Sequence, residues 1–276
     1  MNPQKPWWLG WVALFSVCAG GCKPQQQAPL SASQRDAIQA RATTNFESAW
    51  LFKPVEAGRE SPIAVRLAPI LIRQVTQTNA TRPGREGLDW PDAPRLVVGE
   101  TGATVVNGRS HQQLGYTWTA PARTAPEAAG QTTQTTQGVR LTLNSNGAPV
   151  LWEVLEDLSG ATVLYAAQSL ERAARAEFGP PLPGRKFSIE RNLAETSQII
   201  VANVIEDGPL PMGPILYLQS ESGDVAALIC RCMPSQAQTL LGQEDYELNL
   251  ADAKNKTGRR FPPAQWELRL RLPRDW

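Results

Sequence analysis

Prolines and glycines divide this chain into short segments. There are 23 prolines and 21 glycines among its 276 residues. Proline has no amide hydrogen to donate, and glycine loses more backbone freedom on folding than any other residue, so both interrupt regular structure. Short strands joined by turns are therefore favoured over long helices. A hydrophobic content of 42% is ordinary for a folded domain and argues against a chain that is disordered throughout.

One stretch near the N-terminus lacks these interruptions. Residues 34–51 contain neither glycine nor proline. Apolar residues such as Ile38, Ala42 and Phe46 recur there at helical spacing, and Ser33 is a suitable N-cap. The pattern predicts one amphipathic helix over residues 34–51.

Most of the remaining apolar segments are typical of strands. They are short, rich in β-branched residues or alternating in polarity, and flanked by glycine, proline or asparagine. Two further segments, 170–178 and 235–241, are expected to form short helices. The expected strands are residues 63–75 with a bend at Pro69, 96–98, 104–106, 114–119, 139–143, 150–155, 162–166, 199–205, 214–218, 225–232, 246–250 and 266–272.

These elements predict an α+β fold, with a mainly antiparallel sheet, one N-terminal helix and short additional helices. The turn Asn144–Gly147 predicts a hairpin, and a strand over 162–166 follows it closely. Residues 120–138 are of low complexity and are expected to form a disordered loop. We expect a single domain over residues 34–276; the alternative is a division into two domains near this loop.

The first 21 residues have the organisation of a secretory signal. Lys5 supplies one positive charge, an apolar run extends from Trp7 to Val17, and small residues lead to Cys22. A charged start, an apolar core and a small-residue exit characterise a cleavable signal peptide. The apolar run is shorter than the roughly 20 residues that a membrane-spanning helix needs.

The segment Ala19-Gly20-Gly21-Cys22 resembles the lipobox of bacterial lipoproteins. The resemblance implies that Cys22 is acylated and becomes the first residue after cleavage, and Lys23 after it is compatible with the outer rather than the inner membrane. It covers only about the first 22 residues and implies nothing about the mature domain. Residues 22–33 then form a flexible tether. Cleavage that releases a soluble protein, or an uncleaved anchor, are the alternatives.

The overall charge of the chain points to no polyanionic partner. The chain has 27 Lys and Arg against 26 Asp and Glu, and removal of the leader with Lys5 balances the two sets. A balanced composition gives no electrostatic footprint for nucleic acid or for an anionic membrane surface. The expected partners are therefore a bilayer, through Cys22, and a second envelope protein.

Cys230 and Cys232 form the best candidate site. Two residues apart on a strand, they point to the same face, and Arg231 between them would favour a thiolate. Three interpretations stay open: an inert or disulfide-bonded structural pair, a reversible redox pair, and a metal site for Zn or Cu(I). The metal site would take a further ligand from elsewhere, and His111 is the one histidine of the chain.

No catalytic residue is assigned. A serine–histidine triad would have to use His111, and no Gly-x-Ser-x-Gly sequence supports one. Carboxylates that could serve acid–base chemistry are scattered, with Glu153, Glu156 and Asp157 near one hairpin. Whether the protein is an enzyme is left undecided.

Three classes of function follow. The first is an envelope lipoprotein whose domain binds a partner without chemistry. The second is a redox or metal-handling protein that uses Cys230 and Cys232. The third is a hydrolase of cell-envelope polymer. No cofactor is expected apart from Zn or Cu in the second class.

Overall fold

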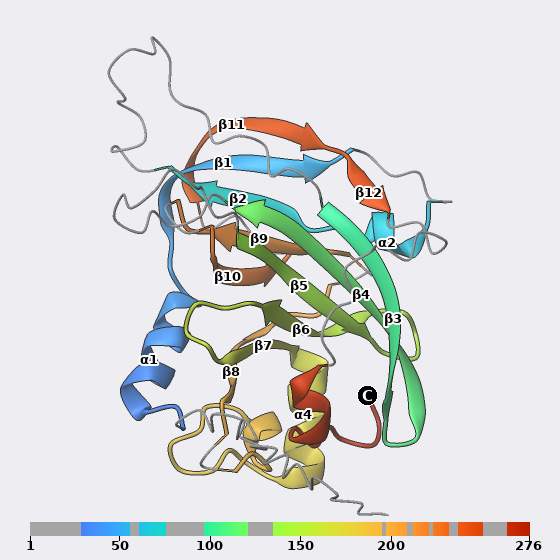
Figure 1. Cartoon of the computed structure of the whole chain (residues 1–276). Helices are drawn as coiled ribbons and strands as arrows, with labels where there is room; N and C mark the ends of the chain where they lie inside the picture. The colour runs from blue at the N-terminus through green and yellow to red at the C-terminus, as the bar shows by residue number, and fades with distance from the viewer. Residues whose placement is uncertain are drawn as a thin grey trace, which may run out of the picture.

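Two β-sheets dominate the part of the chain that the computed structural model describes (Figure 1). The leader, Cys22, Cys232 and residues 121–134 of the expected loop lie outside the described residues. The described residues are 29–55, 61–75, 97–120, 135–194, 197–208, 212–220, 223–231, 237–250 and 264–276.

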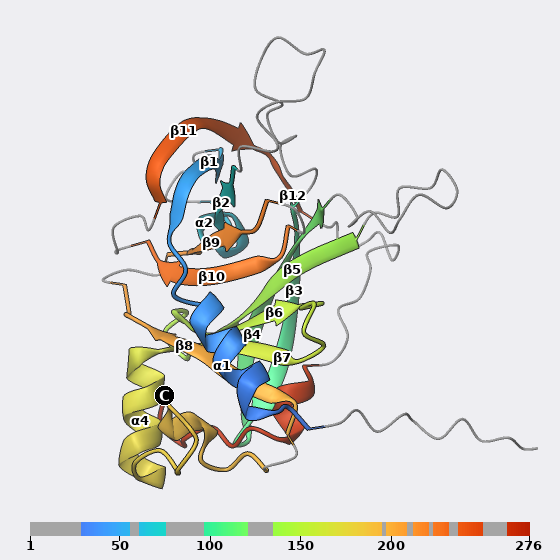
Figure 2. The ribbon, with the colours of Figure 1, turned by 90° about the vertical axis from the view of Figure 1, so that its left-hand side faces the viewer.

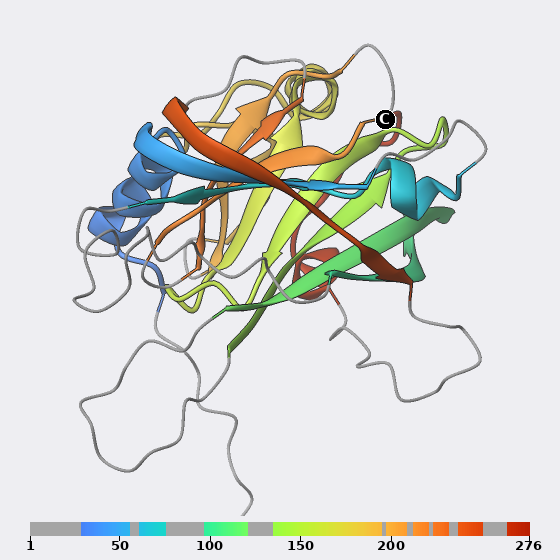
Figure 3. The ribbon, with the colours of Figure 1, turned by 90° about the horizontal axis from the view of Figure 1, so that it is seen from above.

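The first sheet has five strands in the order β10-β9-β2-β1-β11. It contains both antiparallel and parallel pairs: β1 is antiparallel to β2 but parallel to β11, and β2 is parallel to β9. Seen from above, β11 crosses over the other strands from the α1 side to the α2 side (Figure 3). The strands are β1 (Phe46–Pro54), β2 (Ile70–Gln74), β9 (Pro214–Leu218), β10 (Val225–Cys230) and β11 (Ala237–Tyr246).

The second sheet has seven strands in the order β12-β3-β4-β5-β6-β7-β8. The run from β3 to β7 is antiparallel throughout, whereas β8 and β12 at the two edges are parallel to their neighbours. The strands are β3 (Val97–Val106), β4 (Arg109–Ala120), β5 (Thr135–Leu143), β6 (Pro149–Leu155), β7 (Thr162–Ala167), β8 (Ile199–Ile205) and β12 (Leu248–Leu250).

The predicted α+β class with a mainly antiparallel sheet is wrong. The fold is mostly β, and both sheets are mixed. Three of the parallel pairs join strands that are far apart in sequence: β1 with β11, β2 with β9, and β3 with β12. Hydrophobic pattern and turn signals report local connections, so they indicated hairpins and missed these long-range pairs.

The helix predicted over residues 34–51 is wrong in its second half. Helix α1 covers Ala32–Arg41, and Ser31, not Ser33, caps it through a reciprocal pair of hydrogen bonds with Gln34. Strand β1 then begins at Phe46. Its two faces belong to different apolar clusters, Leu51 to one and Phe52 to the other. A strand that is apolar on both faces lacks the alternation that identifies strands, which explains the error.

Two other predictions fail near the C-terminus. Residues 235–241 were expected to be helical, but β11 starts at Ala237. Residues 266–272 were expected to form a strand, but the 3-10 helix η2 (Gln265–Leu268) occupies this stretch. Trp266, Leu270 and Leu272 are all buried, so the apolar pattern there reflects a segment packed irregularly against a sheet.

Several local predictions are confirmed. Strands β5 and β6 form the expected hairpin around Asn144–Gly147, and β7 pairs next to β6. Helix α4 (Gln168–Phe178) ends at Gly179, whose φ of 90° favours glycine. The strand predicted over 63–75 is wrong in its first half, where the short helix α2 (Ile63–Arg66) precedes β2. A further 3-10 helix, η1 (Ser188–Glu190), follows α4.

The seven-stranded sheet has two differently covered faces. Trp152 and Tyr165 are paired across β6 and β7, and the Tyr165 hydroxyl donates to the Ala226 carbonyl of β10, so this face packs on the five-stranded sheet. Successive side chains on a strand point to opposite faces, so Glu153 belongs to the other face. There the indole N–H of Trp266, in η2, donates to Glu153. The C-terminal segment therefore covers the second face.

Gly138 of β5 lies in the middle of the seven-stranded sheet, in close contact with the backbone of β4. A Cβ atom at this position would lie 2.4 Å from the backbone carbonyl oxygen of Tyr116, a distance that no side chain tolerates. Around Gly102, also on a strand of this sheet, nothing lies within 4 Å of such an atom.

We expect Gly138→Ala to lower the free energy of unfolding by about 1–3 kcal/mol, because the backbone of β4 must move to admit the methyl group. Gly102→Ala is the matched control and should change it by less than about 1 kcal/mol. Urea unfolding of both variants checks this. Equal losses in the two variants would contradict the packing described.

Candidate functional site

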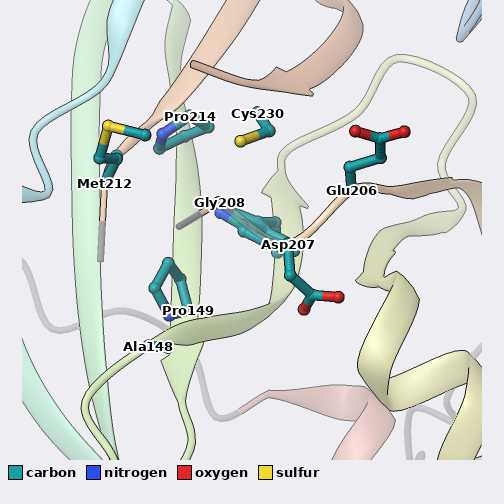
Figure 4. Close-up of a pocket in the computed structure, with 10 residues that line it drawn as sticks. Ala148, Pro149, Glu206, Asp207, Gly208, Met212, Pro214 and Cys230 are labelled. Carbon is teal, nitrogen blue, oxygen red and sulfur yellow. The ribbon is translucent and has the colours of Figure 1, made fainter. Parts of the chain in front are cut away.

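Cys230 lies where the two sheets meet, at the end of β10. It is buried and disulfide-bonded. It lines a small cavity of about 40 Å³, together with Trp152 of β6 and the segments that follow β8 and precede β9 (Figure 4). A space of this size holds a few water molecules, whereas pockets for small-molecule ligands usually measure about 300–1,000 Å³.

Glu206 and Asp207 also line this cavity. In Figure 4 the carboxylate of Asp207 points away from Cys230. It accepts hydrogen bonds from the backbone amide and the hydroxyl of Ser169, at 2.8 and 2.6 Å. Asp207 therefore satisfies an otherwise unpaired amide in the first turn of α4, which is a structural duty.

His111 does not lie beside Cys230. Its ring is buried, with Nδ1 3.1 Å from the Leu143 carbonyl oxygen, and it stacks on Trp276 at 4.2 Å between ring centroids. Gln113, on the same face of β4, contacts Glu267 of the C-terminal segment. His111 is thus on the face that η2 covers, and Cys230 is across the sheet from it.

The metal hypothesis would accordingly need ligands other than His111 beside Cys230. Among the residues that the structure describes, no group of three or more His, Cys, Asp and Glu side chains is arranged to hold a metal ion. A disulfide sulfur is also not the thiolate that binds Zn or Cu(I). Cys232 lies outside the described residues, so the geometry of the predicted pair is not assigned here.

Glu153 takes part in a buried ion pair. One of its carboxylate oxygens accepts a hydrogen bond from Arg140 at 3.1 Å and another from Trp266 at 3.2 Å. Burial raises the pKa of Glu153 from 4.5 to about 7, against the opposing effects of the Arg140 charge and the Trp266 hydrogen bond. The arrangement fixes the C-terminal segment to the sheet.

The other two candidate carboxylates lie elsewhere. Asp157 is buried, 2.5 Å from an Arg41 nitrogen of α1, and it accepts hydrogen bonds from Ser159. Glu156 is exposed at a turn, with a φ of 56°. Glu153 and Asp157 thus have separate partners at separate places, and the three carboxylates do not line one cleft.

Sequence reasoning missed the buried charges. Arg140 was counted within an ordinary strand, and Glu190, which is almost wholly buried, was not noticed. Glu190 accepts the amide of Val201, and burial raises its pKa while nearby Arg185 lowers it. A single charge on an otherwise apolar strand, as at Arg140, was the available signal.

Comparison with known proteins adds little. No protein-family model matches this chain, and no curated protein matches it. A solved structure described as "Toxin fold as basis for microbial attack and plant defense" is similar at 13% identity and a TM-score of 0.21, over 51% of this chain and 58% of that one. A likeness this weak supports no inference about fold or function. No helix among the described residues is long and apolar enough to cross a membrane.

The raised pKa of Glu153 has a defined effect on stability. Between the unfolded pKa of about 4.5 and the folded pKa of about 7, the folded state binds the extra proton, so stability is greatest at the acidic end and falls as pH rises. For this one group, the decrease in the free energy of unfolding over that pH range approaches about 3 kcal/mol. Glu153→Gln should make the slope of unfolding free energy between about pH 5 and pH 7 shallower. Some slope should remain, because burial also raises the pKa of Glu190.

Denaturant unfolding at several pH values measures that slope. The variant will be less stable overall, because an amide replaces the carboxylate that faces the buried charge of Arg140. The slope and not the stability is therefore the test, and an unchanged slope would contradict the assignment.

Proposed function

We propose that this chain is an exported, lipid-anchored envelope protein whose mature domain binds a partner protein and catalyses no reaction. The observation that carries the proposal is the exposed edge strand β11. The export signal and Cys22 supply the location, and β11 supplies the surface.

Strand β11 pairs with β1 along one side, and within the described residues it has no strand on its other side. Only Tyr246 among its ten residues is buried. A sheet edge of this kind is a template for an added strand, since its backbone donors and acceptors are spaced to pair with an extended segment.

Two adjacent apolar side chains mark the middle of this edge. Leu240 is 45% exposed and Leu241 is 38% exposed. The two side chains are adjacent and both exposed, so β11 presents apolar surface to solvent here. The pairing with β1 shifts register at this point, so that Ala49 faces Leu240 and Trp50 faces Gly242. Leu241 is the extra residue of a bulge.

Charge indicates what kind of partner would fit. The stretch 237–250 contains three carboxylates, Glu244, Asp245 and Glu247, and no lysine or arginine. Lys53 on β1 lies 3.7 Å from Asp245, in a partly exposed pair of little energetic value. We infer that the partner presents an extended segment with lysine or arginine beside an apolar residue.

The buried charges support a binding domain over a hydrolase. Glu153, paired with Arg140, accepts a hydrogen bond from Trp266 of the C-terminal segment, and Asp157 pairs with Arg41 of α1. Carboxylates engaged in this way serve the fold.

Cys22→Ala should move the protein from the membrane fraction to the soluble fraction or leave it as an uncleaved precursor. Acyl chains contribute about 0.8 kcal/mol for each buried CH₂ group, and two or three chains hold a protein firmly. Fractionation of the native host, with the size of the product read on a gel, checks this. A cleaved variant that still sediments with membrane would contradict the lipid anchor.

A photo-cross-linking residue in place of Leu241 should yield a discrete adduct with another envelope protein in intact cells. The same residue in place of Leu158, 54% exposed at a turn after β6, is the matched control and should not. We then keep the cross-linker at position 241 and add Leu240→Asp and Gln238→Asp. These changes should abolish the adduct, because added carboxylates oppose strand pairing. Equal adducts at both positions would contradict the use of β11.

A further inference from the structure

The fold separates charges that balance in the composition. The stretch 237–250, which holds β11 and β12, carries three carboxylates and no cation. The segment 168–194, from α4 through η1, carries five cations and three carboxylates. Figures 1 and 2, at right angles to each other, both place β11 and α4 at opposite ends of the molecule. The stretch 237–250 is therefore acidic and the segment 168–194 basic.

The carboxylates at the α4 end are occupied by internal contacts. Glu171 accepts hydrogen bonds from two backbone amides of η1, at 2.6 and 3.0 Å. Glu190 is buried and accepts a backbone amide of β8. Glu177 accepts the backbone amide of Arg274 at 2.7 Å. These bonds hold the carboxylates against the fold and reduce what they offer to solvent.

Three of the five cations at this end are exposed, whereas Arg185 is paired with Glu190. The side chain of Arg172 is 72% exposed, with its nearest carboxylate, Asp207, 3.9 Å away. Arg175 and Lys186 are exposed as well. We call these three residues the basic surface. Against them, α1 adds one exposed carboxylate, Asp36.

The tether joins the domain at this same end. Both views show the first turn of α1 at the end of the molecule where α4 lies (Figures 1 and 2), and Arg35 of that turn donates to the Ser197 carbonyl at 3.1 Å, just before β8. Leu30, which packs on the core, is the eighth residue after Cys22. Eight residues span at most about 28 Å, so an anchored Cys22 keeps this end near the bilayer.

We propose that the basic surface docks on an anionic phospholipid bilayer and orients the anchored domain. The docking rests on the proposed anchor, and it adds a contact that the anchor does not require. Each Lys or Arg near an anionic surface strengthens association about fivefold, so three give roughly a hundredfold. Leu182, exposed between Pro181 and Pro183, lies on the same segment and offers an apolar tip.

The first experiment uses a protein that has no acyl chain. The chain from residue 22 onward with Cys22→Ala retains every described element, because these begin at residue 29. We expect it to sediment with phosphatidylglycerol-containing vesicles, not with pure phosphatidylcholine vesicles, and to dissociate as salt screens the charges. Equal sedimentation with both vesicles, or none with either, would overturn the proposal.

Charge variants assign the binding to this surface. Arg172→Glu, Arg175→Glu and Lys186→Glu together should weaken binding to the anionic vesicles by a hundredfold or more. Arg172→Lys with Arg175→Lys is the matched control and should bind as the parent does. If the triple variant fails to fold, the salt dependence of the parent still tests whether charge drives the binding.

A second measurement uses the acylated protein. Hydrogen exchange of the amides in 172–191 should be slower on anionic than on neutral vesicles, with β11 unchanged. Slower exchange confined to β11, or no difference between vesicles, would overturn the docking while the acyl anchor stands. Conversely, vesicle binding by a native protein without fatty acid would support the basic surface and disprove the anchor.

Discussion

The apolar contact between the two sheets is the interaction on which the rest of this structure depends. Two buried phenols of the seven-stranded sheet hold what packs on it: the Tyr165 hydroxyl donates to the Ala226 carbonyl of β10 at 3.3 Å, and the Tyr116 hydroxyl to the Ala64 carbonyl of α2 at 2.7 Å. Burial raises the pKa of both phenols far above the ordinary value, which keeps them neutral donors. An unpaired hydroxyl in this interior would cost free energy, so these bonds favour one placement of the sheets. That placement leaves β11 at one end of the molecule and α4 at the other.

The sequence predicted the elements whose signals are local. The turn before β6 and the glycine that ends α4 act within a few residues, so both were found. Residues 235–241 have a local pattern that predicts helix, whereas β11 forms there because it pairs with β1, near the opposite end of the chain. The arrangement of the candidate site residues could not be predicted from local signals. His111 and Cys230 lie on opposite sides of the seven-stranded sheet, and the side that a residue occupies depends on long-range strand pairing. The balanced overall composition gave no sign of the separation of charge.

The two proposed surfaces are consistent with each other. The basic surface and the start of α1 share one end of the molecule, and β11 lies at the other (Figures 1 and 2). A domain held to a bilayer at the first end would present its open sheet edge away from the membrane, where a partner can reach it. The acidic residues beside Leu240 and Leu241 would also be kept from an anionic surface, which repels them.

The central claim is that the chain acts from a lipid anchor at Cys22, and the chemistry of the native N-terminus tests it most directly. Mass spectrometry of the N-terminal peptide, from protein purified from its own host, reads that chemistry. The account predicts a peptide that starts at Cys22 and carries fatty acids on the cysteine. A peptide that starts at Met1, or one that starts at residue 22 or later without fatty acid, would contradict the account.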